Sequence, residues 1–324
     1  MSLEALIDQR AADLSMSGVV RVVQAGDVLA EAAYQDVRTN AGVEITAETA
    51  FQVASITKSF TAVLALQEVE KGRLDLNATL ADYLPAFEAA YADQVTVRQL
   101  LQNRSGIPHY VDIPGWFEPE VKDAFTPASF LDAIAALELR SEPGTTYYYS
   151  NANYYLLGLI LEEVTGESYE VLLAEGILAP LGLEGTGQIY DEGSVVAPSF
   201  LDIGGDFERI NLSNRALFRA TASMSATAED LTTFGEAMIA GALLSEEMQA
   251  ILWDAGAPMA FQVATTALGG AEVPVVLYNG ELVGTTSLLV MFPEQEGVVV
   301  LLANNSTSYG ALLEWAAEIA EAAF

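Results

Sequence analysis

The first third of the chain begins with two kinds of hydrophobic pattern. Residues 3–14 carry hydrophobic side chains three and four positions apart, which is the spacing of one face of an α-helix. Two runs rich in valine and alanine follow at residues 18–24 and 28–34, separated by Ala25-Gly26-Asp27. A turn of this composition between two such runs predicts a β-hairpin after an N-terminal helix.

The last quarter of the chain has a similar strand-like character. Short hydrophobic runs alternate there with turns that contain glycine or proline. The runs lie at residues 259–265, 273–278, 286–292 and 298–302, and residues 310–323 follow with helical spacing. We predict that both ends of the chain contribute to one antiparallel sheet, flanked by the two terminal helices.

Most of the chain between these ends has helical spacing, broken by loops rich in proline and glycine. The helical segments lie at residues 58–71, 96–103, 127–137, 153–165, 168–179, 228–240 and 245–252. We therefore predict an α/β fold of the α+β type, with a discontinuous α/β lobe formed by residues 1–54 and 255–324. A mostly helical lobe of residues 55–254 is inserted into it. A cleft between two such lobes is a common place for a small-molecule site.

Hydrophobic residues make up 52% of the chain, which is ample for a packed interior. The longest apolar stretches, such as residues 154–161 and 298–303, are far shorter than the roughly 20 residues of a membrane-spanning helix. Residues 1–7 lack the basic and apolar regions of a signal peptide. The sequence predicts a soluble protein without a membrane span, cytoplasmic if no leader has been removed, and leaves the oligomeric state open.

Acidic residues outnumber basic ones by 45 to 13, which gives a net charge of −32. Nucleic acids and anionic membranes are disfavoured as partners, because phosphate groups are bound by clustered cations. The excess also suggests adaptation to high salt, where screening weakens the repulsion between like charges. The partner we expect is a small-molecule or short-peptide substrate.

The chain has no cysteine and a single histidine, His109. Disulfides, thiolate metal sites and multi-histidine zinc sites are thereby excluded. A magnesium or calcium site made of carboxylates alone stays open, although no EF-hand loop or similar spacing is present. We expect no metal and no cofactor.

Ser55 and Lys58 stand three residues apart at the predicted start of an apolar helix. On a helix these side chains share a face, and a desolvated lysine can accept the proton of a serine hydroxyl without any histidine. The pair therefore points to covalent acyl transfer with Ser55 as the nucleophile. A motif with only two fixed residues can also occur by chance, and the alternative is then a surface lysine on an ordinary helix.

A polar and aromatic run at residues 145–151 leads into the next predicted helix. In an extended segment Tyr149 and Asn151 would point the same way, because they are two residues apart. A tyrosine beside a cationic lysine can act as acid or base, and Asn151 can hold a substrate amide or carbonyl. The alternative is an aromatic loop packed under the helix, with Asn151 as its cap.

Together these segments resemble the serine β-lactamase and penicillin-binding-protein superfamily, in particular its class C-like branch of esterases, D-aminopeptidases and penicillin-binding-protein homologues. Ser55-Ile56-Thr57-Lys58 looks like the family's S-x-x-K motif, and Tyr149-Ser150-Asn151 like its Y-x-N motif. Similar segments lie in order around them at residues 70–76, 83–85, 96–101, 105–108, 180–183 and 225–231. The resemblance implies a β-lactamase/transpeptidase-like fold and a serine hydrolase that forms an acyl-enzyme.

The resemblance also implies a role for each motif residue. Ser55 would be the acylated nucleophile, Lys58 its proton acceptor, Tyr149 the proton shuttle, and Asn151 a substrate-orienting partner. The family's oxyanion hole uses the backbone N–H groups of the serine and of the residue after the third motif. In this chain those residues would be Ser55 and Glu281, donating to charge that develops only in the tetrahedral intermediate.

The third motif departs from the family pattern. The family usually has Lys-Thr-Gly or His-x-Gly on an inner strand, and the aligned substrate-binding stretch here is Tyr278-Asn279-Gly280. A phenol cannot supply the positive charge that helps many members bind a substrate carboxylate. We therefore expect small neutral esters or amides to be preferred over β-lactams, although Arg104 or another arginine could substitute for the missing cation.

Several alternatives stay open. The activity could be that of a D-amino-acid peptidase or a β-lactamase, or the protein could bind a ligand without turning it over. His109 is expected at the rim of the cleft rather than at a catalytic position. Trp116 and Phe117 are candidates for an apolar acyl pocket, with ordinary packing as the alternative. The absence of a G-x-S-x-G elbow argues against an α/β-hydrolase.

Overall fold

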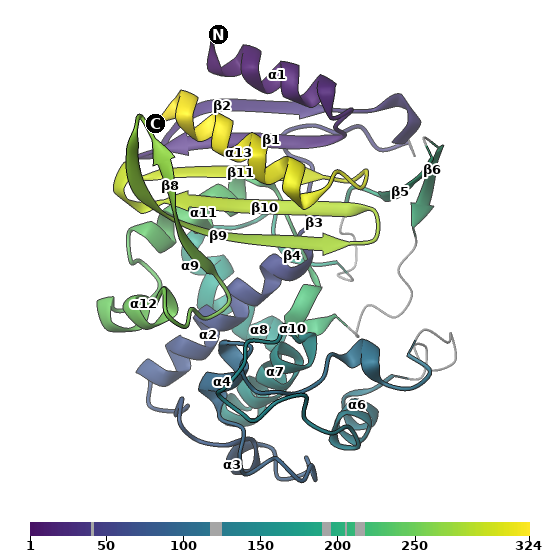
Figure 1. Ribbon diagram of the computed structural model, residues 1–324, viewed down its shortest axis with the longest axis vertical. Coiled ribbons are helices and arrows are strands. Elements are labelled where there is room, and N and C mark those ends of the chain that lie inside the picture. Colours follow the sequence, from purple (N-terminus) through teal and green to yellow (C-terminus); the bar gives the residue numbers. More distant parts are fainter. Residues whose placement is uncertain (40–41, 117–124, 190–195, 205, 211–217) are drawn as a thin grey trace.

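The strand-like runs at the two ends of the chain form one sheet in the computed structural model, which describes residues 1–324 except 40–41, 117–124, 190–195, 205 and 211–217 (Figure 1). The sheet has six strands in the order β2-β1-β11-β10-β9-β8, and each neighbouring pair is antiparallel. Its strands are β1 (Gly18–Gln24), β2 (Asp27–Tyr34), β8 (Gln262–Leu268), β9 (Ala271–Leu282), β10 (Thr285–Phe292) and β11 (Gly297–Ala303). Strand β1 joins the two chain ends because it pairs with both β2 and β11.

Both faces of this sheet are covered, so its central strands are hydrophobic at nearly every position. The covering helices are α1 (Leu3–Asp13), α11 (Ala228–Ile239) and α13 (Tyr309–Ala323). Val299 of β11 belongs to a core cluster with Trp315 of α13, whereas the next residue, Val300, belongs to a second cluster with Phe234 of α11. The terminal helices α1 and α13 therefore share one face, and α11 lies on the other (Figure 1).

The middle of the chain is mainly helical, and several helices begin at a capping residue. Thr96, Thr126 and Ser245 each accept a backbone hydrogen bond at a helix N-terminus. The helices are α2 (Thr57–Glu70), α3 (Leu80–Tyr83), α4 (Val97–Leu101), α6 (Pro127–Ala135), α7 (Asn151–Thr165), α8 (Tyr169–Leu173), α9 (Ala179–Leu181), α10 (Arg219–Ala222) and α12 (Glu246–Leu252). Single turns of 3₁₀ or π helix are η1 (Val37–Thr39), η2 (Ala54–Ile56), η3 (Tyr110–Asp112), η4 (Ala174–Leu178) and η6 (Pro293–Gln295). Within the described ranges, no helix has the length and apolar character needed to cross a lipid bilayer.

Two small sheets were not predicted, because strands of two to five residues are too short to reveal an alternation. Their strands are β3 (Phe51–Gln52), β4 (Gly187–Gln188), β5 (Ser199–Ile203), β6 (Asp206–Ile210) and β7 (Met224–Ala226). Phe51 pairs with Ala226, and the backbone N–H of Val53 donates to the carbonyl of Met224 at 3.0 Å. This pairing fixes the chain immediately before Ser55.

The predicted antiparallel sheet and mixed α/β fold are confirmed, with differences at particular elements. Strand β9 runs on to Leu282, because it stays paired with β10 through Gly280 and Glu281. The predicted helix of residues 168–179 is interrupted by the π turn η4. The division into lobes at residues 54/55 and 254/255 stays a prediction.

Candidate active site

Ser55 lies in the turn η2, between strand β3 and helix α2. Ala54, immediately before it, has φ +48, in the left-handed region that residues with a side chain rarely adopt. The carbonyl of Val53 accepts a hydrogen bond from Ser287 Oγ of β10 at 2.8 Å, which ties the turn to the sheet. Ser55 is therefore held where the helical part of the molecule meets the sheet, next to a strained backbone position.

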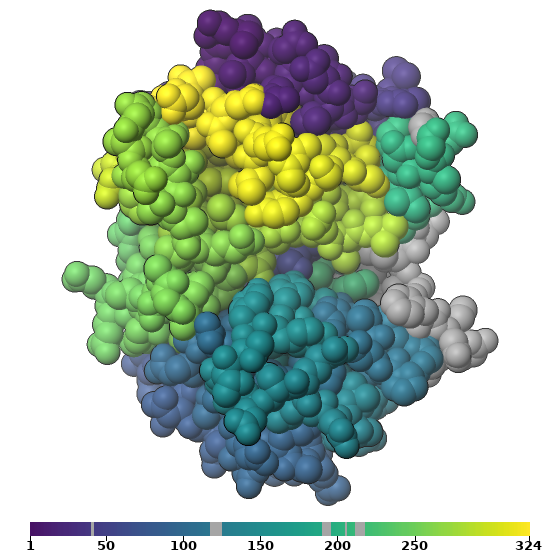
Figure 2. All heavy atoms as spheres, in the orientation of Figure 1, coloured from purple at the N-terminus to yellow at the C-terminus, as the bar shows by residue number. Residues whose placement is uncertain are grey.

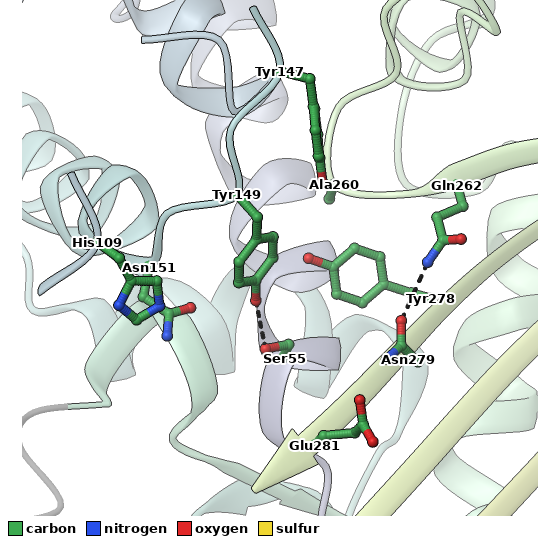
Figure 3. Close-up of a pocket in the computed structure, with 10 residues that line it drawn as sticks. All are labelled: Ser55, His109, Tyr147, Tyr149, Asn151, Ala260, Gln262, Tyr278, Asn279 and Glu281. Carbon is green, nitrogen blue, oxygen red and sulfur yellow. Dashed lines mark hydrogen bonds between the residues drawn. The ribbon is translucent and has the colours of Figure 1, made fainter. Parts of the chain in front are cut away.

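The side chains of Ser55, Lys58 and Tyr149 meet at the serine hydroxyl. Lys58 follows Ser55 by one helical turn, and its Nζ donates to Ser55 Oγ at 3.0 Å. Tyr149 reaches the same atom from the loop before α7, with 2.7 Å between the two hydroxyl oxygens (Figure 3). The structure brings together these three residues of the first and second motifs, and their catalytic roles stay predictions.

Lys58 is completely buried, and its ammonium nitrogen has no carboxylate partner in the described part of the chain. Its second hydrogen bond goes to the main-chain carbonyl of Thr221 at 2.8 Å. Burial lowers the pKa of Lys58 well below its usual value, because the charged form loses its hydration. A neutral amine at this position can keep donating to Thr221 while its lone pair accepts the proton of Ser55.

Two tyrosines lie beside this serine, and Figure 3 shows the Tyr278 hydroxyl directed toward Tyr149. Burial raises the pKa of Tyr149 to about 12, and hydrogen bonds with Ser55 and Tyr278 act only partly in the other direction. Burial also raises the pKa of Tyr278 well above its usual value. Both phenols therefore stay protonated at neutral pH. Tyr149 therefore presents a neutral hydroxyl to Ser55, not a phenolate.

Strand β9 presents an open edge beside the serine. Strand β8 pairs with it only as far as Leu277, which lies opposite Gln262. Residues 278–282 have no strand beside them on that edge among the residues that the structure describes. Asn279 of this stretch accepts a hydrogen bond from Gln262 Nε2 at 3.2 Å (Figure 3). An extended ligand can lie along such an edge, because its backbone groups are not all engaged.

Gly280 brings β9 into backbone contact with the serine turn. A Cβ at this position would lie 2.1 Å from the carbonyl oxygen of Val53 and 2.9 Å from the backbone nitrogen of Ser55. Only a residue without a side chain fits such an approach. The N–H groups of Ser55 and Glu281, which we predict to form the oxyanion hole, thus belong to two segments that touch.

Gly280→Ala is expected to destabilise the protein by roughly 1–3 kcal/mol, because the new methyl group overlaps backbone atoms that cannot move freely. Urea unfolding of the purified variant measures this change. Gly310→Ala is the matched control: no atom lies within 4 Å of a Cβ there, and the position is in helix α13, where alanine is favoured over glycine. Equal stabilities of the two variants would contradict the close contact at Gly280.

Asn151 is the first residue of helix α7, and Ser150 occupies the N-cap position. The predicted helix of residues 153–165 thus begins two residues early, whereas Ser150 has an extended backbone (φ −141, ψ 120) and Tyr149 and Asn151 line the same cavity. Asn151 Nδ2 donates to Tyr110 Oη at 2.8 Å. Its Oδ1 is buried without a partner in the described part of the chain, which leaves an acceptor for a substrate N–H group.

A cavity of about 460 Å³ lies over Ser55, and the space-filling view is hollowed between the sheet and the helical part (Figure 2). Its lining residues are Ser55, His109, Tyr147, Tyr149, Asn151, Ala260, Gln262, Tyr278, Asn279 and Glu281. Glu281 carries the only carboxylate among them, and burial lowers the pKa of His109 to about 4, so that its ring is neutral. The described residues contain no group of three or more histidine, aspartate or glutamate side chains suited to a metal ion. The lining thus offers hydroxyls, amides, aromatic rings and one carboxylate, and no cation.

Several residues of the site were not predicted to belong to it. Tyr147, Ala260 and Gln262 line the cavity, Tyr110 holds Asn151, and Thr221 accepts from Lys58. Tyr147 stands in the same aromatic run as Tyr149, which was the one available signal. The use of a main-chain carbonyl as an acceptor, such as that of Thr221, cannot be predicted from the residue type, because every residue has such a carbonyl.

The remaining candidates lie near the site in different ways. His109 lines the cavity, with its ring centroid 6.3 Å from that of Tyr149, and its Nδ1 accepts from the backbone N–H of Val111. Trp116 stacks on Tyr110 at 4.4 Å and is not part of the cavity lining, which favours ordinary packing. Phe117 lies outside the described residues.

Comparison with known proteins identifies the family of the chain. A sequence profile described as Beta-lactamase matches residues 3–324. Protein flp of Staphylococcus aureus (strain N315) is 29% identical over 292 residues, covering 85% of this chain and 56% of that protein. The chain thus spans about half the length of this curated relative.

Solved structures with 22–23% identity share the fold. The D-stereospecific amidohydrolase from Streptomyces sp. has a TM-score of 0.82 and 23% identity, covering 97% of this chain and 98% of its own. The D-amino acid amidase from Ochrobactrum anthropi SV3, complexed with D-phenylalanine, has a TM-score of 0.82 and 22% identity, covering 99% and 97%. Because the profile extends over nearly the whole sequence, this chain belongs to the beta-lactamase family.

Proposed function

We propose that the protein is a serine hydrolase that forms an acyl-enzyme on Ser55. One observation carries this proposal: a fully buried amine, Lys58, lies 3.0 Å from the serine hydroxyl and has its pKa lowered by burial. A buried lysine with a purely structural role would be stabilised in its charged form by a carboxylate partner. A lysine that accepts a proton must instead be neutral before the reaction. The third member, Tyr149, completes a proton path from the serine to a leaving group.

The reaction follows from these contacts. Lys58 accepts the proton of Ser55 as Oγ attacks the substrate carbonyl carbon, and the resulting oxyanion is stabilised by the N–H groups of Ser55 and Glu281. The bond to the leaving group then breaks, and the proton passes through the Tyr149 hydroxyl to that group. Water attacks the acyl-enzyme, loses its proton along the same path in reverse, and releases the acid together with free Ser55.

The substrate that we propose is a small ester or amide without a carboxylate beside the reacting carbonyl. The cavity lining supports this choice, because Tyr278 stands where the family has a cation and Glu281 adds a negative charge. Two solved structures with the same fold are an amidohydrolase and an amino acid amidase. The substrate panel should therefore include both D- and L-amino-acid amides. The absence of a nucleic-acid partner and a cytoplasmic location stay predictions.

We expect kcat/KM for p-nitrophenyl butyrate to exceed that for penicillin G and nitrocefin by at least about tenfold. The residues that line the cavity over Ser55 include no cation that could form a charge-assisted hydrogen bond with the carboxylate of these β-lactams. Steady-state hydrolysis at fixed enzyme concentration measures this ratio. Tyr278→Lys is expected to reduce it by placing an amine at that position, and Tyr278→Phe, which removes only the hydroxyl, serves as its matched control. Faster turnover of penicillin by the unaltered protein would refute the substrate class.

A further inference from the structure

A second, smaller cavity adjoins the one over Ser55. Its volume is about 130 Å³, and it shares Tyr147, Ala260 and Gln262 with the larger cavity. Tyr147 is a 60% exposed aromatic side chain on the boundary between the two. A ligand that fills the larger cavity can therefore extend past Tyr147 into the smaller one.

Arg104 lines this smaller cavity and carries its only charge. The side chain is partly buried, and it forms no ion pair or side-chain hydrogen bond with any residue that the structure describes. The chain has 45 acidic residues, and most described arginines pair with one of them. A partly desolvated guanidinium without a partner is suited to an anion from outside the chain.

The backbone around Arg104 is held in place. Its N–H donates to the carbonyl of Gln99 at 2.8 Å, and its own carbonyl accepts from Gly144 at 2.7 Å. Asn103 before it has φ +52, and its carbonyl accepts from Tyr148 at 2.8 Å. Residues 103–104 thus lie directly beside the segment that continues to Tyr149, whose hydroxyl contacts Ser55 Oγ.

From these observations we infer that the smaller cavity is a subsite for a carboxylate at the far end of the substrate, recognised by Arg104. The inference rests on the proposed acyl-enzyme function and names its substrate class: an ester or amide uncharged at the reacting carbonyl, with a distal carboxylate. The backbone from Tyr149 to Tyr147, on the boundary between the cavities, spans at most about 7 Å, and the aliphatic linker of the substrate has to extend beyond that boundary. Such a carboxylate would be bidentate to the guanidinium.

The test uses p-nitrophenyl monoesters of adipic, suberic and sebacic acid, each compared with the same compound as its methyl ester. The measured quantity is the ratio of kcat/KM for the free acid to that for the methyl ester, which cancels differences in leaving group and chain length. We expect this ratio to exceed one, and to fall roughly tenfold in Arg104→Gln. Arg104→Lys, which keeps a positive charge, is expected to retain part of the preference.

Arg98→Gln is the matched control, because it removes the same charge from neighbouring helix α4 at a residue that lines neither cavity. It is expected to leave the ratio unchanged. An equal fall of the ratio in both variants, or no fall in Arg104→Gln, would overturn the subsite while hydrolysis of the methyl esters continues. Failure of every ester to react, acid or neutral, would instead refute the proposed function itself.

Discussion

Ser55→Ala is expected to lower kcat for p-nitrophenyl butyrate by about 10⁴-fold or more. No other hydroxyl can replace Ser55 Oγ, because Lys58 Nζ and Tyr149 Oη both converge on that atom. Loss of a serine nucleophile removes the covalent pathway altogether and leaves only the residual effect of binding and oxyanion stabilisation. The measurement is a steady-state assay with protein free of unaltered enzyme.

Ser59→Ala is the matched control for this variant. Ser59 lies one turn further along α2, is fully buried, and donates to the carbonyl of Ile56 at 2.7 Å. Its loss removes a local hydrogen bond, worth about 1 kcal/mol of stability, without touching the reacting atoms. Activity of Ser55→Ala comparable to that of Ser59→Ala would show that the nucleophile lies elsewhere.

Lys58→Met is expected to lower kcat/KM by about 10²–10⁴-fold, the range of general-base catalysis. Methionine preserves the unbranched shape of the side chain but cannot accept the proton of Ser55. Because the neutral amine is the active form, activity of the unaltered enzyme should rise with pH through the pKa of Lys58, which burial lowers. The residual activity of the variant should lack that step in a pH–rate profile, and a profile identical to that of the unaltered enzyme would contradict the role of Lys58.

The same burial makes stability depend on pH in a known direction. Between the lowered pKa of native Lys58 and its ordinary value of 10.5, the unfolded chain binds a proton that the native protein does not. Stability therefore rises with pH in that window and falls as the pH is lowered. The unfolding free energy of the unaltered protein, relative to Lys58→Met, should thus decrease from pH 10 to pH 7. An unchanged difference would mean that the native lysine keeps its charge.

The sequence was sufficient where a pattern determines geometry locally. Ser55 and Lys58 are three residues apart on one helix, so their contact follows from helical periodicity. The sheet could be predicted because central strands such as β1 and β11 are hydrophobic on both faces. The antiparallel sheet flanked by α1 and α13 follows from that pattern.

The rest depends on contacts between distant segments. Asn151 donates to Tyr110, and Lys58 donates to the carbonyl of Thr221, pairings that no local pattern encodes. Whether Tyr149 is charged or neutral depends on burial, which appears only once the segments around Ser55 are packed. The third motif shows the same limit: its sequence reveals a missing cation, whereas the unpaired Arg104 in an adjoining cavity requires the structure.

An acyl-enzyme on Ser55 can be observed by mass spectrometry of the intact protein, quenched in acid during turnover of p-nitrophenyl butyrate. We expect a population heavier by one butyryl group, with the modification on the peptide that contains Ser55 and absent from Ser55→Ala. Continued turnover by protein that carries the butyryl group on another residue, or an equal modification of Ser55→Ala, would contradict it.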